Sequence, residues 1–364
     1  MSEKKIQVYF PAQYPIGTSP SQRFRIEQYF SYLLTENITF NIEPFITEYF
    51  YPIFFKKGFL IKKTLGTLNG FLRRCWSLRK IHKYDYIFIQ REASPIGPPI
   101  FEWLYTKVFR AKVIYDFDDA IWIPRISESN RMAIHFKCFW KIKHIIKWSH
   151  QVIVGNSYLF QYANQFNKGV VIIPTSVDTV KKFNLLANQD VQKVSVVWTG
   201  SFSTNQYVEA LSPVLNQLQK TVPFHFVVIS NKRPNIHLQD MEFVEWSELN
   251  EVSTLAQCQI GIMPMSKDEW SKGKCGFKLI QYMSLGIVPV ADNWGANADI
   301  IENNLSGILI QSADEWIEKL KILIQDTAQR KLISHHAQLR AKASFSLDNN
   351  FSLLFPLFRD TILP

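Results

Sequence analysis

The sequence has no long hydrophobic run: its longest apolar stretches are of strand length, whereas a helix that crosses a bilayer needs about 18 apolar residues. Its N-terminus, MSEKKIQVYF, lacks the basic end, apolar stretch and small-residue cleavage site of a secretory signal. It also has no internal repeat and no low-complexity tract. These absences, in a chain of 364 residues of which 47% are hydrophobic, predict a cytoplasmic globular protein with two domains.

Cysteine and histidine are sparse and show no ligand spacing. The four cysteines stand far apart without a CxxC pair, which predicts reduced thiols. We expect no metal site, because metal-ligand spacing is also missing at His135, His150, His335 and His336. No motif of a nucleic-acid-binding module occurs, so nucleic acid is not an expected partner.

Acidic residues are missing from two long stretches of the first half. Residues 1–185 contain 26 Lys and Arg against 13 Asp and Glu, a net charge of +13, whereas residues 186–364 contain 15 and 18, a net charge of −3. Residues 56–83 carry nine Lys and Arg and no acid, and residues 129–177 are also free of acids.

In both acid-free stretches the basic residues alternate with Phe, Trp, Leu and Ile. This composition suits a surface that lies against anionic lipid headgroups, although an ordinary solvated helix face has the same pattern. If the membrane interpretation holds, reversing the charges of the following residues should weaken binding to anionic vesicles: Lys62, Lys63, Arg73 and Arg74.

Short β-rich runs alternate with helix-length amphipathic segments along the whole chain. The expected strands are residues 5–10, 37–45, 84–90, 111–117, 151–155, 169–174, 193–200, 224–230, 241–246, 259–265, 286–292 and 306–310. Helices are expected in the gaps, for example over residues 20–34 and 97–110. Strand, helix and strand in series predict parallel sheets with right-handed crossovers, and the near-continuous apolar strands predict sheets covered on both faces.

Two such series predict an α/β fold of two doubly wound, Rossmann-like domains that face a central cleft, because ligands bind beyond the carboxyl ends of the strands. The first domain is expected over residues 1–185 and the second over residues 186–344, with the polar stretch 179–193 as the linker. A C-terminal helix, residues 345–364, is expected to pack back onto the first domain.

The stretch GKCGFKLIQYMSLGIVPV, residues 273–290, has the strongest functional signal. Gly276 lets the backbone approach a ligand, and a helix is expected to start near Phe277, where the free amides and the helix dipole attract an anion. Lys274 and Lys278 add two full positive charges. Gly286 has the position of a C′ glycine that ends the helix. A capped helix with surface lysines explains Gly286 equally well, but it explains the crowding of glycine and lysine poorly.

This stretch, extended to GKCGFKLIQYMSLGIVPVADNWGANADII, resembles the donor-binding segment of the family-4 retaining glycosyltransferases of GT-B fold, which reads roughly E-G-F-G-x4-E-A-M-A-x-G-x-P-V-V. Four further segments agree in order: VIVGNSYLFQYA, VVIIPTSVD, WTGSFSTNQY and IGIMPM. The resemblance covers most of residues 110–310 and weakens before residue 110.

The resemblance implies a hexosyltransferase that takes a sugar from a UDP- or GDP-sugar and retains the anomeric configuration, without an obligatory metal. The second domain would bind the donor and the first domain the acceptor, a lipid-linked glycan or a polysaccharide. It further implies a role in polysaccharide or lipopolysaccharide biosynthesis at bacterial surfaces. With the charge distribution, it suggests a cytoplasmic enzyme peripheral on the inner face of the cytoplasmic membrane.

The chain departs from the family at the two motif glutamates, which usually contact the donor sugar and the ribose diol. Alignment on Met283 and Gly286 places Gly273 and Gln281 at these positions. Gln281 keeps an acceptor and two donors for a ribose diol, whereas Gly273 offers only its backbone. Glu269 is a speculative substitute for the missing carboxylate.

The family's Arg/Lys pair after the first strand of the second domain is also altered, to GSFSTNQY. There Gly200, Ser201 and Thr204 could meet phosphate through amides and hydroxyls. Lys274 and Lys278 would then neutralise its charge.

In the first half, VIYDFDDAIW (113–122) leads a strand into three aspartates. We favour Asp118 and Asp119 at the C-terminal end of the strand, where they would bind acceptor hydroxyls or act as a catalytic base. The string also resembles the metal-binding D-x-D of haloacid-dehalogenase-type phosphatases, in which Asp116 would be essential, and that of the other large glycosyltransferase fold. Alternatively, the aspartates cap the loop or pair with Arg125 or Arg131.

Two strand-end loops complete the candidate site. In PAQYPIGTSPSQRFR (11–25), Gly17 would let the loop approach the donor phosphates, while Arg23 and Arg25 could meet an anionic group of donor or acceptor. In IQREASPIGPP (89–99), Arg91 and Glu92 could line the acceptor side, although an internal ion pair is an equal alternative. Because both motif glutamates are absent, a non-catalytic or partner-dependent nucleotide-sugar-binding protein and a sugar-nucleotide epimerase also stay open.

Overall fold

The computed structural model describes residues 5–56, 58–124 and 136–359, and the candidates His135, Arg125 and Arg131 lie outside them. Internal contacts divide the chain into two compact units, Ser176–Asn349 and the remainder. The division falls at Thr175, earlier than the boundary expected at residue 185. The reason is that the expected linker packs on the second unit: Phe183 is buried in its core, and the Ala187 amide donates to the Leu285 carbonyl at 2.8 Å.

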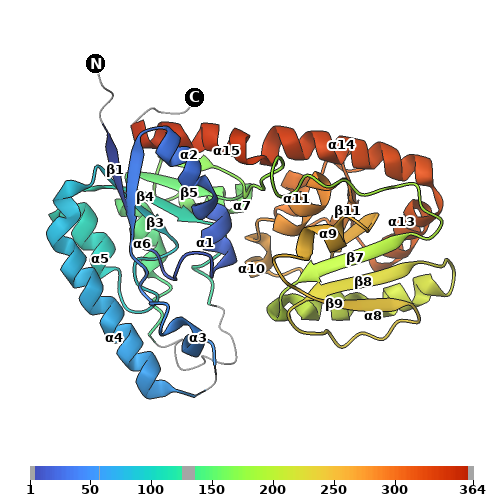
Figure 1. The fold of residues 1–364 in the computed structure, drawn as a ribbon, viewed down its shortest axis with the longest axis horizontal. Helices are drawn as coiled ribbons and strands as arrows, with labels where there is room; N and C mark the ends of the chain where they lie inside the picture. Colours follow the sequence, from blue (N-terminus) through green and yellow to red (C-terminus); the bar gives the residue numbers. More distant parts are fainter. Residues whose placement is uncertain (1–4, 57, 125–135, 360–364) are drawn as a thin grey trace. The chain divides into compact units, whose positions relative to one another are not determined.

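The first unit is built around a six-stranded sheet of order β2-β1-β3-β4-β5-β6 (Figure 1). Every neighbouring pair is parallel. The strands are β1 Ile6–Phe10, β2 Ile38–Ile42, β3 Tyr86–Gln90, β4 Lys112–Phe117, β5 Gln151–Val154 and β6 Val170–Ile172. The central strand β3 is buried along its whole length, as the apolar run YIFI predicts for a sheet covered on both faces.

The second unit repeats this plan with the order β12-β11-β10-β7-β8-β9, again all parallel. Its strands are β7 Ser195–Gly200, β8 His225–Ser230, β9 Met241–Glu245, β10 Ile260–Met263, β11 Val288–Asp292 and β12 Ile308–Ile310. Every strand expected from the sequence is present, shortened at its ends. The α/β fold class with two doubly wound sheets is therefore confirmed.

Helices connect the strands and cover the sheets. Those of the first unit are α1 Pro20–Arg25, α2 Phe30–Thr35, α3 Tyr51–Phe54, α4 Leu60–Ser77, α5 Ile100–Trp103, α6 Lys141–Trp148 and α7 Ser157–Ala163, with short helices η1 Glu27–Tyr29, η2 Leu78–Lys83 and η3 Leu104–Val108. The single helix expected over residues 20–34 is interrupted at Ile26, whose φ of −142° is not helical. The helix expected over residues 97–110 begins only after Pro98 and Pro99 and continues as the π-helical η3.

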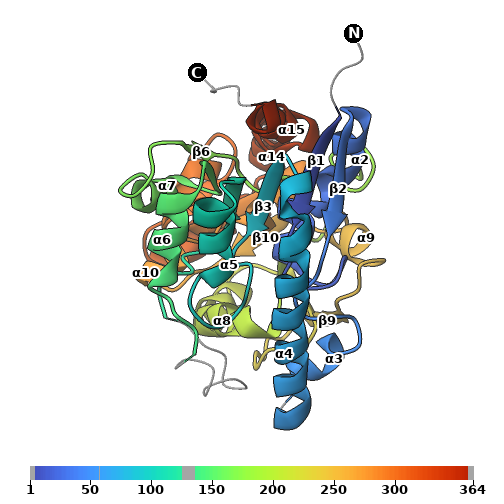
Figure 2. The ribbon, with the colours of Figure 1, turned by 90° about the vertical axis from the view of Figure 1, so that its left-hand side faces the viewer.

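The helix α4 stands along one side of the first unit (Figure 2) and packs through small residues. A Cβ on Gly70 would lie 2.6 Å from the Phe45 ring, so the helix approaches the core closely there. On the same side Arg74 is fully buried: its guanidinium donates to the Ala93 and Ala12 carbonyls. Arg74 is therefore a structural residue, and its expected part in a membrane-facing surface is wrong.

The helices of the second unit are α8 Asn205–Gln219, α9 Glu251–Leu255, α10 Glu269–Lys272, α11 Phe277–Ser284, α12 Asn297–Ile300, α13 Ala313–Gln325 and α14 Thr327–Phe345, with the short helix η5 Phe202–Thr204. The chain then continues through α15 Leu347–Leu354 and η6 Phe355–Arg359. From Asn350 onward it belongs to the first unit, where Phe351 stacks on Tyr29 and Phe358 on Phe88. Within the described ranges, no helix is both long and apolar enough to cross a membrane.

Candidate functional site

In the second unit, the candidate phosphate-binding segment is the turn that leads into α11. Gly276 precedes the first helical residue with a φ of +58°, a left-handed conformation that favours glycine. A Cβ there would also lie 2.1 Å from Cδ1 of Ile300, so the position has no room for a side chain. At the other end, Gly286 has a φ of +67°, and the bonds Gly286–Met283 and Ile287–Tyr282 close a Schellman motif. Glycine therefore sets both ends of α11.

Lys278, in the first turn of α11, is the most unusual cation of this segment. Its Nζ lies 4.7 Å from the ring centre of the buried Trp198, and no described residue gives it an anionic or hydrogen-bonding partner. Burial, reinforced by the nearby charge of Lys274, lowers the pKa of Lys278 to about 7. Lys274 itself lies over the Trp270 ring at 4.0 Å. An anion bound beside Lys278 would restore its full charge.

The end of β7 forms a tight turn next to this lysine. A Cβ on Gly200 would lie 2.5 Å from the Trp198 ring, so glycine permits the indole to sit beneath the turn. Ser201 and Thr204 follow, but the Thr204 hydroxyl is already used, because it donates to the Ser201 carbonyl at 2.9 Å. The Ser201 hydroxyl is 2.8 Å from that of Ser203. The structure therefore gathers serine hydroxyls here and keeps Thr204 as a local cap.

Gln281 lies one turn after Lys278 and is buried against α9. Its Nε2 donates to Oε1 of Glu251 at 3.1 Å, and the indole of Trp246 donates to the same oxygen at 3.1 Å. Oε2 of Glu251 has no hydrogen-bond partner among the described residues, although Glu251 is buried. A carboxylate thus reaches the position where Gln281 replaces a family glutamate. Sequence reasoning missed Glu251; its position just after β9, at the carboxyl edge of the sheet, was the available signal.

The other departure from the family pattern lies at the end of α10. Gly273 ends α10 with an ordinary φ of −76°. Glu269, considered as its substitute, is well exposed and pairs with Lys272 at 2.5 Å. Phe277 is partly buried at the start of α11.

In the first unit, Arg91 gathers the two candidate catalytic aspartates. Its Nη2 donates to Oδ1 of Asp118 at 3.1 Å and also to Oδ2 of Asp119. Arg91 directly follows β3 and has a φ of +65°, a left-handed conformation that is uncommon for a non-glycine residue and costs conformational energy. The ends of β3 and β4 therefore bring together one guanidinium and two carboxylates, all only partly exposed.

Two polar residues that sequence reasoning missed hold Asp118 in place. Ser21 of α1 donates to Oδ2 of Asp118 at 2.6 Å, and Gln90, the last residue of β3, donates to the Ser21 hydroxyl at 2.7 Å. Burial by itself raises the pKa of Asp118, but the charges of Arg91 and Arg25 outweigh it and hold that pKa below its usual value. Asp118 is therefore an ionised hydrogen-bond acceptor rather than a strong base at neutral pH.

Arg25, expected to meet an anionic ligand, instead forms a buried ion pair with Asp116. Its Nη1 also donates to the Ile173 carbonyl at 2.7 Å, which ties α1 to the end of β6. Burial raises the pKa of Asp116 despite the guanidinium. This ion pair connects α1 to the strand ends. Because each group already has the other as its counterion, neither serves as a ligand-binding group.

The remaining candidates are dispersed. Glu92 is buried with its carboxylate 3.4 Å from Nζ of Lys141, so the internal ion pair left open by the sequence is what the structure contains. Gly17 lies in an exposed turn with a φ of +79°, and its amide donates to Glu27 at 2.9 Å. Arg23 on α1 lies over the Phe24 ring at 4.8 Å. Among the described residues, no group of three or more His, Cys, Asp or Glu is placed to hold a metal ion.

The second unit matches a known family of enzymes. Residues 193–326 match the family model described as glycosyl transferases group 1. This range contains every residue that we assigned to the donor except Gly17. The protein is a glycosyltransferase with the GT-B fold.

Solved structures resemble this glycosyltransferase over its whole length. Sucrose-phosphate synthase from Thermosynechococcus elongatus has a TM-score of 0.70 at 13% identity and a glycosyltransferase from Rickettsia africae 0.70 at 16%, each covering 98% of this chain and 99% of its own. HepE from Anabaena in complex with UDP-glucose has 0.67 at 15%, covering 98% and 100%. Identities this low show the fold alone. A search of curated proteins found no match.

Proposed function

We propose that this glycosyltransferase takes a sugar from a nucleotide-diphosphate sugar and that its second unit binds the diphosphate. The observation that carries the proposal is Lys278, a cation without an anionic partner among the described residues, with a lowered pKa. It stands in the first turn of α11, which begins directly after Gly276. A helix N-terminus and a desolvated ammonium are both stabilised by a diphosphate.

The positive charges of Lys274 and Lys278 would also stabilise the diphosphate as it leaves. In other enzymes a divalent cation supplies this positive charge. We therefore expect transfer without an obligatory metal. The family resemblance adds retention of the anomeric configuration and a UDP- or GDP-sugar as donor. HepE, one of the similar structures, is described in complex with UDP-glucose, which favours testing UDP-sugars first.

The ribose would bind one turn further along α11. Gln281 follows Lys278 by three residues, a rise of about 4.5 Å along the helix. Gln281 donates to Glu251, whose Oε2 has no hydrogen-bond partner among the described residues and is an acceptor for a hydroxyl group. Glu251→Gln should then reduce the preference for UDP over 2′-deoxy-UDP.

The acceptor would use the carboxylates at the end of β4. Asp118 and Asp119 share the single guanidinium of Arg91, so this cluster suits the hydroxyl groups of a sugar acceptor. The lowered pKa of Asp118 favours orienting such a hydroxyl over removing its proton. Arg23 is a further candidate for an anionic part of the acceptor. The expected acceptors are lipid-linked glycans and polysaccharides.

An anionic membrane surface is the proposed partner of α4. Glycines and Arg74 fill the side of this helix that faces the core, whereas large apolar side chains at helical spacing point outward and are 53% to 78% exposed: Ile61, Leu65, Leu68, Leu72 and Trp76. Lys62 and Arg73 flank this stripe with positive charge. An outward apolar edge with basic flanks fits the interfacial layer of an anionic bilayer, in keeping with a peripheral enzyme on the inner face of the cytoplasmic membrane.

A panel of nucleotide sugars tests the function. The purified chain should be stabilised against heat by one nucleotide-diphosphate sugar and by its nucleotide, because ligand binding to the folded state raises the melting temperature. With an acceptor, transfer should proceed in EDTA and give the same anomer as the donor. Binding without transfer or hydrolysis would indicate a non-catalytic protein, and a changed sugar nucleotide without acceptor would indicate an epimerase. No binding of any member would refute the proposal.

A further inference from the structure

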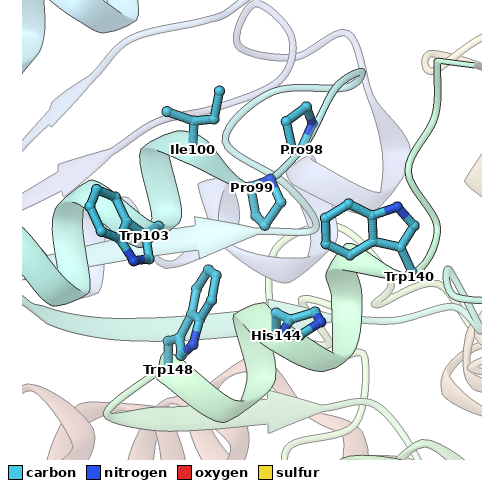
Figure 3. A pocket seen from close by; sticks show the side chains of 7 residues that line it. All are labelled: Pro98, Pro99, Ile100, Trp103, Trp140, His144 and Trp148. Carbon is cyan, nitrogen blue, oxygen red and sulfur yellow. The ribbon is translucent and has the colours of Figure 1, made fainter.

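A groove of about 450 Å³ lies on the first unit (Figure 3). Figure 3 shows Trp140 at one end, Trp103 and Trp148 at the other, and Pro99 and His144 between them. The indoles come from two helices and the residue before one of them: Trp103 ends α5, Trp148 ends α6, and Trp140 directly precedes α6. Trp140 and Trp148 therefore lie at opposite ends of α6, and both line the groove.

The lining of this groove is suited to hydrocarbon rather than to sugar. Apart from the imidazole of His144 and the indole N–H groups, the groove is lined only by apolar side chains, among them Pro98, Pro99 and Ile100. Trp103 and Trp140 are 45% and 53% exposed, so the groove keeps apolar surface in contact with water. A sugar ring needs several polar partners for its hydroxyl groups, whereas an alkyl chain needs only apolar contact.

The charge next to the groove is positive. Lys143 and Lys147, each one residue before a groove residue of α6, are exposed. Of the acidic residues on the neighbouring segments, Glu102 of α5 is buried and Glu92 is buried against Lys141. An anionic headgroup therefore meets two accessible cations there and no exposed carboxylate of these segments.

The groove is also connected to the proposed acceptor residues. The loop of residues 91–99 begins at Arg91 and ends at Pro98 and Pro99, which line the groove, so the two are at most about 25 Å apart. Lys141, the first residue of α6, fastens this loop by donating to the Ser94 carbonyl at 2.9 Å. The loop therefore joins the groove to the end of β3, where Arg91 lies.

We propose that the tryptophan-lined groove binds the hydrocarbon chain of a lipid phosphate whose phosphate faces Lys143 and Lys147. This assigns the acceptor to the lipid-linked class, and in that respect it rests on the proposed function. The contact between the groove and the hydrocarbon requires no nucleotide, so hydrocarbon binding is measured separately from donor binding.

The test measures intrinsic fluorescence during titration with farnesyl phosphate below its micelle concentration, with farnesol, inorganic phosphate and a neutral oligosaccharide as separate arms. Wild type should bind farnesyl phosphate saturably, farnesol more weakly and inorganic phosphate not at all. Trp103→Ser combined with Trp140→Ser should weaken binding at least about tenfold, because both side chains are large apolar contacts. Leu332→Ser combined with Leu339→Ser on α14, two exposed apolar residues outside the groove and outside α4, is the matched control and should bind like wild type.

Lys143→Ala combined with Lys147→Ala should weaken the binding of farnesyl phosphate several-fold. The binding of farnesol should not change, since only the contact between the lysines and the phosphate is lost. A second assay, binding to vesicles of anionic phospholipid, distinguishes a site for a single lipid from a contact with the membrane surface. The proposal is overturned if the oligosaccharide binds instead, if the combined Leu332→Ser and Leu339→Ser control weakens binding as much as the tryptophan variant, or if the tryptophan variant loses vesicle binding alone. Thermal stabilisation by the nucleotide should persist in all these variants, so a failure here leaves the proposed donor site standing.

Discussion

Replacing Lys278 by methionine tests the phosphate assignment most directly. Methionine has a similar length and no charge, so it fills the space over Trp198 without a cation. Two unit charges 4 Å apart attract each other by about 4 kcal/mol at an effective dielectric constant of 20, and a charge-assisted hydrogen bond contributes about 1.5–3 kcal/mol. Lys278→Met should therefore weaken the binding of UDP or GDP by about 2–4 kcal/mol, which raises Kd roughly 30- to 1,000-fold.

The pH dependence gives this prediction a second signature. With a pKa of about 7, free Lys278 is half protonated at neutral pH and mostly neutral above pH 8. Because a diphosphate favours the protonated form, binding must take up a proton at higher pH. The affinity of wild type should fall as the pH rises from 7 to 9, by up to about tenfold per pH unit.

Isothermal titration calorimetry of the nucleotide diphosphate at pH 7, 8 and 9 measures both effects. The nucleotide's own phosphate titrates equally with wild type and Lys278→Met, so the ratio of their affinities isolates the lysine. Lys321→Met, an exposed lysine of α13, controls for a general loss of positive charge. If Lys278→Met binds as tightly as wild type, or if the ratio is the same at every pH, Lys278 does not contact the diphosphate.

Three further changes test the other assignments. Gly276→Ala should cost about 2–4 kcal/mol of folding free energy in urea titrations, through its left-handed φ and its overlap with Ile300, whereas Gly17→Ala, with open space around it, should cost about 1 kcal/mol; equal costs would contradict the close contact. Asp118→Asn should lower the transfer rate at least about tenfold with unchanged nucleotide affinity, and a wild-type rate would remove Asp118 from the acceptor site. Leu65→Ser with Leu72→Ser should reduce binding to anionic vesicles about tenfold in flotation assays, while the same changes at the exposed Leu332 and Leu339 of α14 should not; equal losses would show non-specific adsorption.

Much of the fold follows from local patterns in the sequence. Short β-rich runs separated by helix-length segments predicted every strand of the described residues; the central strands, such as β3 and β10, are apolar because they are buried on both faces. Gly276 and Gly286 marked the ends of α11 for an equally local reason: the backbone there needs positive φ. The crowding of lysine and glycine in the same turn predicts an anion site, which stays a prediction.

Contacts between distant residues were decided only by the tertiary structure. Arg25 and Asp116 are 91 positions apart, so no local pattern could show that they neutralise each other. Helical spacing also could not tell which side of α4 faces inward, since the core accepts Gly70 and Arg74 there through close packing and backbone carbonyls. The position of Glu251 against Gln281 likewise depends on the order of strands in the sheet.

What the sequence by itself determined about this protein is its class: a glycosyltransferase built from alternating strands and helices. What only the tertiary structure decided is the state of each charge in it. The same basic side chain becomes a structural clamp as Arg74, an internal counterion as Arg25, or a cation with a pKa of about 7 as Lys278. The physical reason is that burial and neighbouring charges set the energy of an ion, and both come from residues far away along the chain.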